Sequence, residues 1–89
     1  MSYNVIWKRA ADGQLASIWM DADDRAAISH AARALDRRLA LNPMEQGESR
    51  PSALRIAFEL PLAVLYEIRE DQRIVQVVAV WKVRKRRGT

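Results

Sequence analysis

The fold is decided by one stretch of the sequence, ALRIAFELPLAVLYEIREDQRIVQVVAVWKV, which spans residues 53–83. Apolar and polar side chains alternate through residues 53–60 and again through residues 62–69, and this alternation is typical of half-buried β-strands. Pro61 separates these two segments, and the polar residues EDQR separate the second from an apolar segment over residues 74–83. We therefore predict three successive antiparallel strands, the last of which is apolar on both faces, as in a central strand.

The alternation also predicts which side chains face the core and which lie on the open face of the sheet. We expect one set of the last strand to face the helices: Val75, Val77, Ala79, Trp81 and Val83. We expect the open face to carry the alternate residues of the last strand and those of the two preceding strands: Arg55, Glu59, Ala63, Leu65, Glu67, Ile74, Gln76, Val78, Val80, Lys82 and Arg84. Tyr66 falls on the core face, as do Ile56 and Phe58, which alternate with Arg55. The open face is then expected to carry Arg55 and Glu59 on one strand and Lys82 and Arg84 on another, which predicts a polar, mostly cationic surface over the sheet.

Upstream of these strands, the sequence predicts one further strand and a first helix. Residues 3–8 alternate in the same way and predict a short strand, which we expect to join the sheet beside the last strand. Leu15, Ile18 and Trp19 recur at helical spacing, which predicts a short helix over residues 12–20.

A second, longer helix is predicted to end near Leu41. Its apolar stripe recurs at helical spacing and consists of Ile28, Ala31, Ala32, Leu35 and Leu39. Asp21 or Asp23 is expected to cap its N-terminus, because a carboxylate accepts hydrogen bonds from the free backbone N–H groups there. Asn42 and Pro43 end the helix, since a residue before proline avoids the helical conformation. The segment MEQGESRPS that follows is expected to be a polar loop.

Length and composition restrict the class of protein. The 89 residues are expected to form one domain over residues 1–89, with residues 83–89 as a basic tail that can fray. There is no cysteine, and His30 is the only histidine, so we expect no metal site and no cofactor. The sequence has no signal-peptide pattern and no apolar run long enough to span a bilayer, so we expect a cytoplasmic protein without a membrane partner.

The charge is positive and unevenly distributed. The formal net charge is +4, the sequence pI is about 10.1, and 12 of the 15 cations are arginine. The densest cluster is at the C-terminus and consists of Lys82, Arg84, Lys85, Arg86 and Arg87. Two interpretations stay open at this point: the cluster contacts an anion, such as nucleic acid or an acidic partner chain, or it keeps a small domain soluble.

The order of one strand, two helices and three strands in a chain of 89 residues resembles the RelE/ParE superfamily of bacterial type II toxins. The resemblance is carried by RIAFELPLAVLYEIREDQRIVQVVAVWKVRKR, which is similar to the C-terminal half of the family, and by LDRRLALNP, which is similar to the end of its second helix. It implies an α+β fold in which a helical hairpin packs on a mostly antiparallel four-stranded sheet.

The resemblance implies a toxin that an antitoxin protein silences by wrapping around it with a helix or strand. RelE-like members are ribosome-dependent mRNA endonucleases, and ParE-like members poison DNA gyrase without cutting RNA. We therefore expect an acidic, helical antitoxin as one partner and either ribosome-bound mRNA or DNA gyrase as the other. A third possibility is a non-catalytic basic binding module on the same fold.

The candidate site residues follow from matching this chain to the family position by position. RelE-like nucleases often carry an arginine on the open face of the third strand, where this chain has Ala63. Many also carry histidine or tyrosine near the end of the last strand, and this chain has neither there. If the chain cuts RNA, the expected catalytic residues are Arg55, Lys82 and Arg84, with Glu48 at the start of the second strand as general base. The residues expected to contact nucleic acid or antitoxin are Lys85, Arg86 and Arg87.

Overall fold

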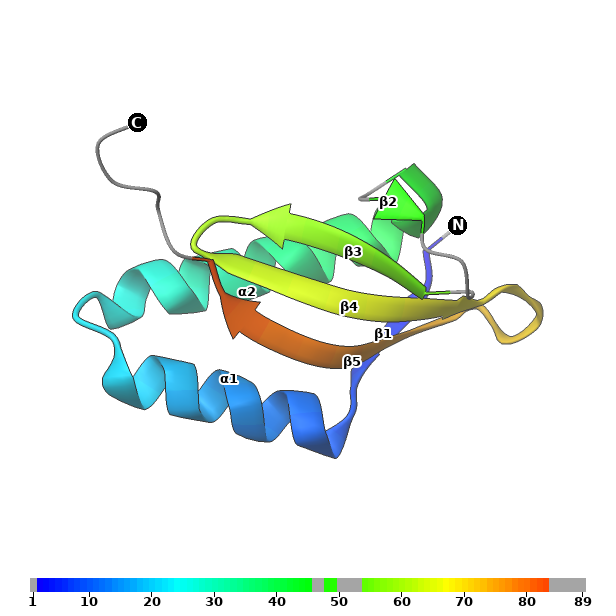
Figure 1. Cartoon of the computed structure of the whole chain (residues 1–89). Coiled ribbons are helices and arrows are strands. Elements are labelled where there is room, and N and C mark those ends of the chain that lie inside the picture. Colours follow the sequence, from blue (N-terminus) through cyan, green and yellow to red (C-terminus); the bar gives the residue numbers. More distant parts are fainter. Residues whose placement is uncertain (1, 46–47, 50–53, 84–89) are drawn as a thin grey trace.

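The computed structural model describes residues 2–45, 48–49 and 54–83. Two helices precede the main strands (Figure 1). One short 3-10 turn follows the second helix, and another connects the last two strands. The elements in chain order are β1 (Asn4–Trp7), α1 (Arg9–Asp21), α2 (Arg25–Leu41), η1 (Pro43–Glu45), β2 (Glu48–Ser49), β3 (Leu54–Glu59), β4 (Leu62–Arg69), η2 (Glu70–Gln72) and β5 (Ile74–Lys82). In Figure 1, α2 crosses behind the sheet and α1 runs beside β5.

The strands of the described residues form one sheet in the order β1-β5-β4-β3-β2. β1 lies parallel to β5, and the remaining neighbours are antiparallel. The predicted α+β fold, its order of elements and the position of the opening strand beside the last strand are confirmed. The two-residue strand β2 lies within the segment that we expected to be a polar loop. It pairs at the sheet edge through its backbone, which requires no apolar pattern in the sequence.

The helix ends differ from the prediction in two places. α1 begins three residues earlier than expected. The prediction missed this first turn because the turn is mostly exposed and shows no apolar periodicity in the sequence. The N-terminal cap of α2 is Asp24 rather than Asp21 or Asp23, and its carboxylate accepts a hydrogen bond from the backbone N–H of Ala27 at 3.0 Å. Asp21 is instead the last residue of α1. Adjacent aspartates are chemically equivalent as caps, so the sequence did not distinguish them.

The core lies between the sheet and the two helices. Its buried members are Ala11, Ile28, Ala31, Leu35, Leu39, Ala57, Leu62, Val64, Tyr66, Val75, Val77 and Val80. Four of the five residues of the predicted α2 stripe are in this set, and Ala32 packs against it. The helical spacing in the sequence therefore identified the face of α2 that is buried.

A β-bulge interrupts β5 at Val78. Leu65 pairs with Ala79 but the next residue, Tyr66, pairs with Val77, so Val78 has no residue opposite it. The extra residue reverses the alternation of side chains beyond this point. Ala79 therefore lies on the open face in register with Leu65, although we expected it on the core face.

The prediction of faces is wrong for the rest of β5 as well. Val80, expected on the open face, is 3% exposed and packs in the core. Trp81, expected on the core face, is in register with Ala63 and lies on the open face. Lys82, expected on the open face, is in register with the core residue Leu62 and lies on the helix side.

The faces of β3 are opposite to the prediction. Ala57 is fully buried in the core, so its alternating neighbours Arg55 and Glu59 lie on the helix side of the sheet. Ile56 and Phe58 consequently lie on the open face. The small side chain of Ala57 fits beneath the helices, and the two charged residues beside it find polar partners at the edge of the core.

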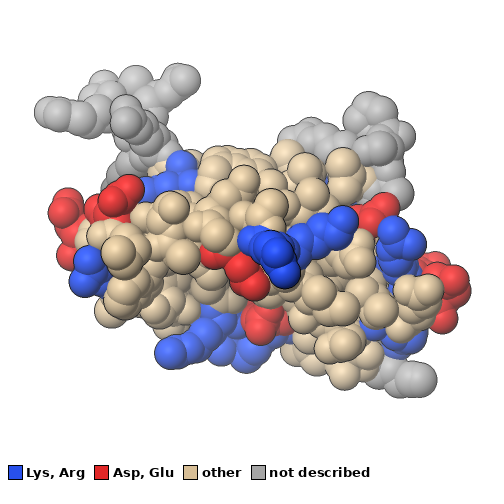
Figure 2. Space-filling view, turned by 90° about the horizontal axis from the view of Figure 1, so that it is seen from below, with Lys and Arg blue, Asp and Glu red and all other residues tan. Residues whose placement is uncertain are grey.

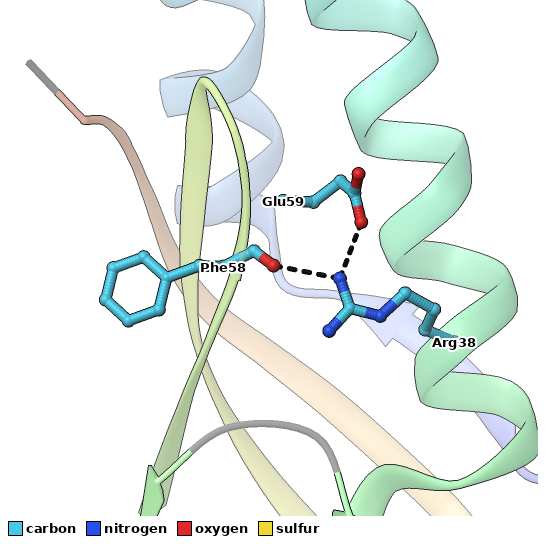
Figure 3. A network of polar contacts seen from close by, with 3 residues as sticks. All are labelled: Arg38, Phe58 and Glu59. Atoms are coloured by element: carbon cyan, nitrogen blue, oxygen red, sulfur yellow. Dashed lines mark hydrogen bonds and ion pairs between the residues drawn. The ribbon is translucent and has the colours of Figure 1, made fainter. Parts of the chain in front are cut away.

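One of these polar partners joins α2 to the turn between β3 and β4 (Figure 3). The Arg38 guanidinium donates hydrogen bonds through Nη1 to the backbone oxygen of Phe58 at 2.8 Å and to Oε1 of Glu59 at 2.6 Å. The two charged side chains are about one-third exposed, at 36% and 33%. Water therefore screens the ion pair in part, and the contact to the backbone oxygen fixes its geometry.

Replacing Arg38 with alanine should lower the free energy of unfolding by about 1 kcal/mol, because it leaves a strand-end carbonyl and a half-buried carboxylate without this donor. Urea unfolding of Arg38→Ala measures the loss. The neighbouring Arg37 is exposed and serves as the control, since Arg37→Ala should change stability by less than about 0.5 kcal/mol. Equal effects of the two substitutions would contradict a specific role for the Arg38 contact.

Candidate functional site

The open face of the sheet carries an apolar surface, which we call the open-face strip. Cross-strand register places its members beside one another on β3, β4 and β5: Ile56, Phe58, Ala63, Leu65, Ala79 and Trp81. Phe58 is 45% exposed and Trp81 is 38% exposed, and Ile6 on β1 adds a further side chain at 38%. Large apolar side chains gathered on an exposed face are typical of a binding surface for another protein.

Ala63 lies at the centre of one row of this strip. Its neighbours in register are Phe58 on β3 and Trp81 on β5, and Ala63 itself is fully buried. The resemblance to RelE-like nucleases implies an arginine at this position. The Ala63 methyl group is flanked in register by these two aromatic residues, so the middle of the open face is apolar and carries no cation among the residues that the structure describes.

Arg55 of the predicted catalytic set is turned away from the open face. It lies on the helix side in register with Tyr66, and its Nη1 donates a hydrogen bond to the backbone oxygen of Met44 in η1 at 3.1 Å. Glu48 opens β2 and is paired through its backbone with Ile56. Arg84 and the predicted contact residues Lys85, Arg86 and Arg87 lie outside the described residues.

The structure does not bring Arg55 and Lys82 together. Arg55 is in register with Tyr66, and Lys82 is in register with Leu62. These positions are four residues apart along β4, which corresponds to about 13 Å at the rise of a strand. RNA cleavage through a single phosphate requires its base, cations and acid around that one group. The catalytic roles of Arg55, Lys82, Arg84 and Glu48 stay predictions.

Tyr66 is buried in the core rather than available at a site. Its hydroxyl donates a hydrogen bond to the backbone oxygen of Pro43 at 2.7 Å and so holds η1 against the sheet. Burial raises the pKa of the Tyr66 hydroxyl above its ordinary value of 10.0, although the positive charges of Arg55 and Arg38 lower it in part. At neutral pH the group is a structural hydrogen-bond donor.

The raised pKa of Tyr66 predicts that the protein loses stability in alkali. The unfolded chain releases this proton near pH 10, before the folded chain does, so the contribution is fully present below pH 10 and declines as the pH rises above it. Urea unfolding between pH 8 and pH 11 measures the decline. Tyr66→Phe removes the titrating group, so the variant should show a smaller decline; an identical decline would mean that other groups cause it.

Charged side chains are interspersed on the side of the molecule where α1 lies. Figure 2 shows Lys and Arg separated there by Asp and Glu and by wide areas of other residues, with no single basic patch among the described residues of that face. Within the described ranges no group of three or more His, Asp or Glu side chains is placed to hold a metal ion. None of the described helices combines the length and the apolarity that crossing a membrane requires.

We did not predict the open-face strip, because we assumed uninterrupted alternation along β5 and placed the apolar set of β3 on the core face. One feature of the sequence indicated the strip. Phe58 and Trp81 are aromatic residues, and the side chains that alternate with them on the same strands also include apolar ones. A strand that is apolar on both faces can bury one face in the core and present a second apolar surface on the other.

Comparisons with known proteins link this chain to others through its fold. No family model matches the sequence, and no curated protein matches it. Among solved structures, a chain of the RelBE2 toxin–antitoxin complex from Mycobacterium tuberculosis is 16% identical with a TM-score of 0.75, covering 94% of this chain and 100% of that chain. A chain of the chromosomal ParDE system from P. aeruginosa is 14% identical with a TM-score of 0.69, covering 92% and 97%.

The isolated RelE toxin from E. coli is also similar in structure. It is 13% identical with a TM-score of 0.65, and the alignment covers 96% of this chain and 88% of that chain. The chain therefore has the fold of the RelE and ParE toxins, and the resemblance predicted from its sequence is confirmed at the level of the fold. RelE-type and ParE-type structures are both among the neighbours, so the fold does not distinguish the two activities.

Proposed function

We propose that this chain is the toxin of a type II toxin–antitoxin pair and that it acts in the cytoplasm by binding a protein target rather than by cutting RNA. The toxin assignment rests on the fold, which the chain shares over nearly its whole length with proteins from RelBE and ParDE complexes. The mode of action rests on one observation, the apolar open-face strip centred on Ala63.

An apolar strip suits a protein target better than a phosphate backbone. Binding to RNA draws most of its affinity from cations that neutralise phosphates. The described open face instead offers Phe58 and Trp81, and aromatic side chains are enriched at the centres of protein–protein interfaces. A ParE-like action on DNA gyrase fits this surface, because it requires binding and no catalytic residues. A RelE-like nuclease would have to assemble Lys82 with residues beyond Val83.

The toxin assignment is tested by inducing the chain in a bacterial host with and without its antitoxin. The antitoxin to use is the protein encoded by the reading frame adjacent to this chain's gene, which we expect to be short, acidic and helical. Induction of the chain alone should arrest growth within minutes, and co-expression of the adjacent protein should prevent the arrest and yield a stable complex of the two chains.

One control makes the outcome of this experiment definite. The chain must accumulate in folded form, which circular dichroism of the purified protein establishes. Folded protein that leaves growth unaffected would overturn the toxin assignment and favour a non-toxic binding module on the same fold. Breaks in DNA with intact messages would support gyrase as the target.

A further inference from the structure

The open face of the sheet carries a polar pair beyond the open-face strip, on two neighbouring strands. Glu67 of β4 and Gln76 of β5 are in register. Each lies between neighbours that pack in or against the core, so both side chains lie on the open face. Residues directly opposite each other have Cβ atoms about 4.5–5.5 Å apart. The two side chains are therefore close enough to contact one group of a bound molecule together.

Apolar side chains surround this polar pair. Leu54 of β3 is in register with Glu67, and Ile6 of β1 is in register with Gln76. Leu65 lies two residues before Glu67 on β4 and belongs to the open-face strip. When a partner covers such a surface, the apolar residues exclude water from the polar contact at its centre and strengthen the hydrogen bonds made there.

Gln76 has a hydrogen-bond acceptor that the folded chain does not use. Its Oε1 is closed off from solvent and accepts no hydrogen bond from the residues that the structure describes. Gln14 shows the usual arrangement, because its Oε1 accepts a hydrogen bond from the backbone N–H of Val80 at 2.9 Å. A covered acceptor without a donor destabilises a fold. Gln76 as a whole is only half-buried, so rotation about its side-chain bonds exposes the amide to a partner without breaking a hydrogen bond of Oε1.

The chemistry of the polar pair selects the group that binds it. An ionised carboxylate only accepts hydrogen bonds, and the amide of Gln76 supplies a further acceptor beside that of Glu67. The ion pair between Glu67 and Arg69 on the same strand is long, at 3.5 Å, and both side chains are partly exposed, so its loss costs little. A guanidinium carries its N–H donors in a planar fork and can donate to both acceptors at once.

We propose that Glu67 and Gln76 bind an arginine side chain of the protein target whose apolar residues pack on the open-face strip. This inference rests on the proposed function, because it names a chemical feature of the target that the strip binds. Glu67 is four residues along β4 from Ala63, which corresponds to about 13 Å. The target therefore carries its arginine about 13 Å from the apolar residues that contact Phe58 and Trp81.

The first test compares stability with growth arrest in Gln76→Met. Methionine keeps the length of the side chain and removes the unused acceptor, so the thermal midpoint of the purified variant should rise by about 4 °C or more. The same variant should need about tenfold more protein per cell for half-maximal growth arrest, as measured by graded induction and immunoblotting. Gln72→Met is the matched control, because Gln72 is exposed in η2, and it should change neither quantity.

Two further variants test the charge of the group that binds. Gln76→Glu keeps an acceptor and places a second carboxylate beside Glu67, so it should lower the thermal midpoint and still arrest growth at the wild-type protein level. Glu67→Lys places a cation where the arginine binds, so it should raise the protein level needed for arrest by about tenfold or more. Glu70→Lys makes the same change of charge at an exposed position of η2 and should arrest growth like the wild type.

The outcomes separate this inference from the proposed function. A wild type that arrests growth, with Gln76→Met arresting it at the same protein level, would overturn the inference and leave the proposed function standing. Loss of arrest in Gln76→Glu, or a thermal midpoint of Gln76→Met at or below that of the wild type, would overturn it as well. A folded wild type without any effect on growth would overturn the proposed function and this inference with it.

Discussion

Replacing Phe58 with glutamate is expected to abolish growth arrest while the protein stays folded. Phe58 is 45% exposed beside Ala63 in the open-face strip, so the substitution removes little buried area and costs about 1 kcal/mol of stability. Placing a carboxylate in an apolar interface should weaken target binding by about 2 kcal/mol or more, which is roughly thirtyfold in affinity. Growth after graded induction measures the loss.

The matched control for this substitution is Leu41→Glu. Leu41 is 63% exposed at the end of α2, so the change removes another exposed apolar side chain and adds the same charge away from the strip. Growth arrest should persist in this variant at equal protein levels. Loss of arrest in both variants, or arrest by Phe58→Glu at the wild-type level of inducer, would contradict a role for the open-face strip.

The second large effect is expected in the core, at Leu35. Leu35 is fully buried on the α2 stripe and belongs to the same core cluster as Val64 and Tyr66 of the central strands. Leu35→Ala should lower the free energy of unfolding by about 2–5 kcal/mol, since it removes buried methyl groups and leaves a cavity. A chain of this length has a total of about 5–13 kcal/mol, so the variant should approach the limit of folding.

Thermal unfolding measures this effect against Leu41→Ala in the same helix. A loss of 2–5 kcal/mol corresponds to a fall in the thermal midpoint of roughly 10–30 °C for a domain of this size. Leu41 is mostly exposed, so Leu41→Ala should shift the midpoint by only a few degrees. A small shift for Leu35→Ala would mean that α2 is not held to the sheet by its apolar stripe.

Leu35 also shows why so much of the fold was predictable. The buried face of α2 is recognisable in the sequence, because its apolar residues recur at helical spacing. Each strand from β3 to β5 is an apolar segment bounded by a turn. The predicted segment over residues 62–69 matches the bounds of β4, and the EDQR segment falls where the chain turns into β5. These features depend on local patterns that neighbouring residues define by themselves.

The faces of the strands were not predictable from local alternation. On β5, the bulge at Val78 reverses the faces, and a bulge depends on the pairing with β4 rather than on any residue type. On β3, both sets of alternating side chains contain residues that can face a core. The packing of α2 determines which set does so, because Arg38 of α2 pairs with Glu59 on the helix side. The candidate site therefore appeared as a cationic face in the sequence and is an apolar face in the structure.

The measurement that tests the central claim most directly is a map of mRNA 5′ ends in the minutes after induction of the wild-type chain. The open-face strip predicts growth arrest with no new ends inside translated codons, and the same pattern in Lys82→Ala. New ends within codons, lost in Lys82→Ala, would show that the chain cuts ribosome-bound mRNA and would contradict an action through protein binding alone.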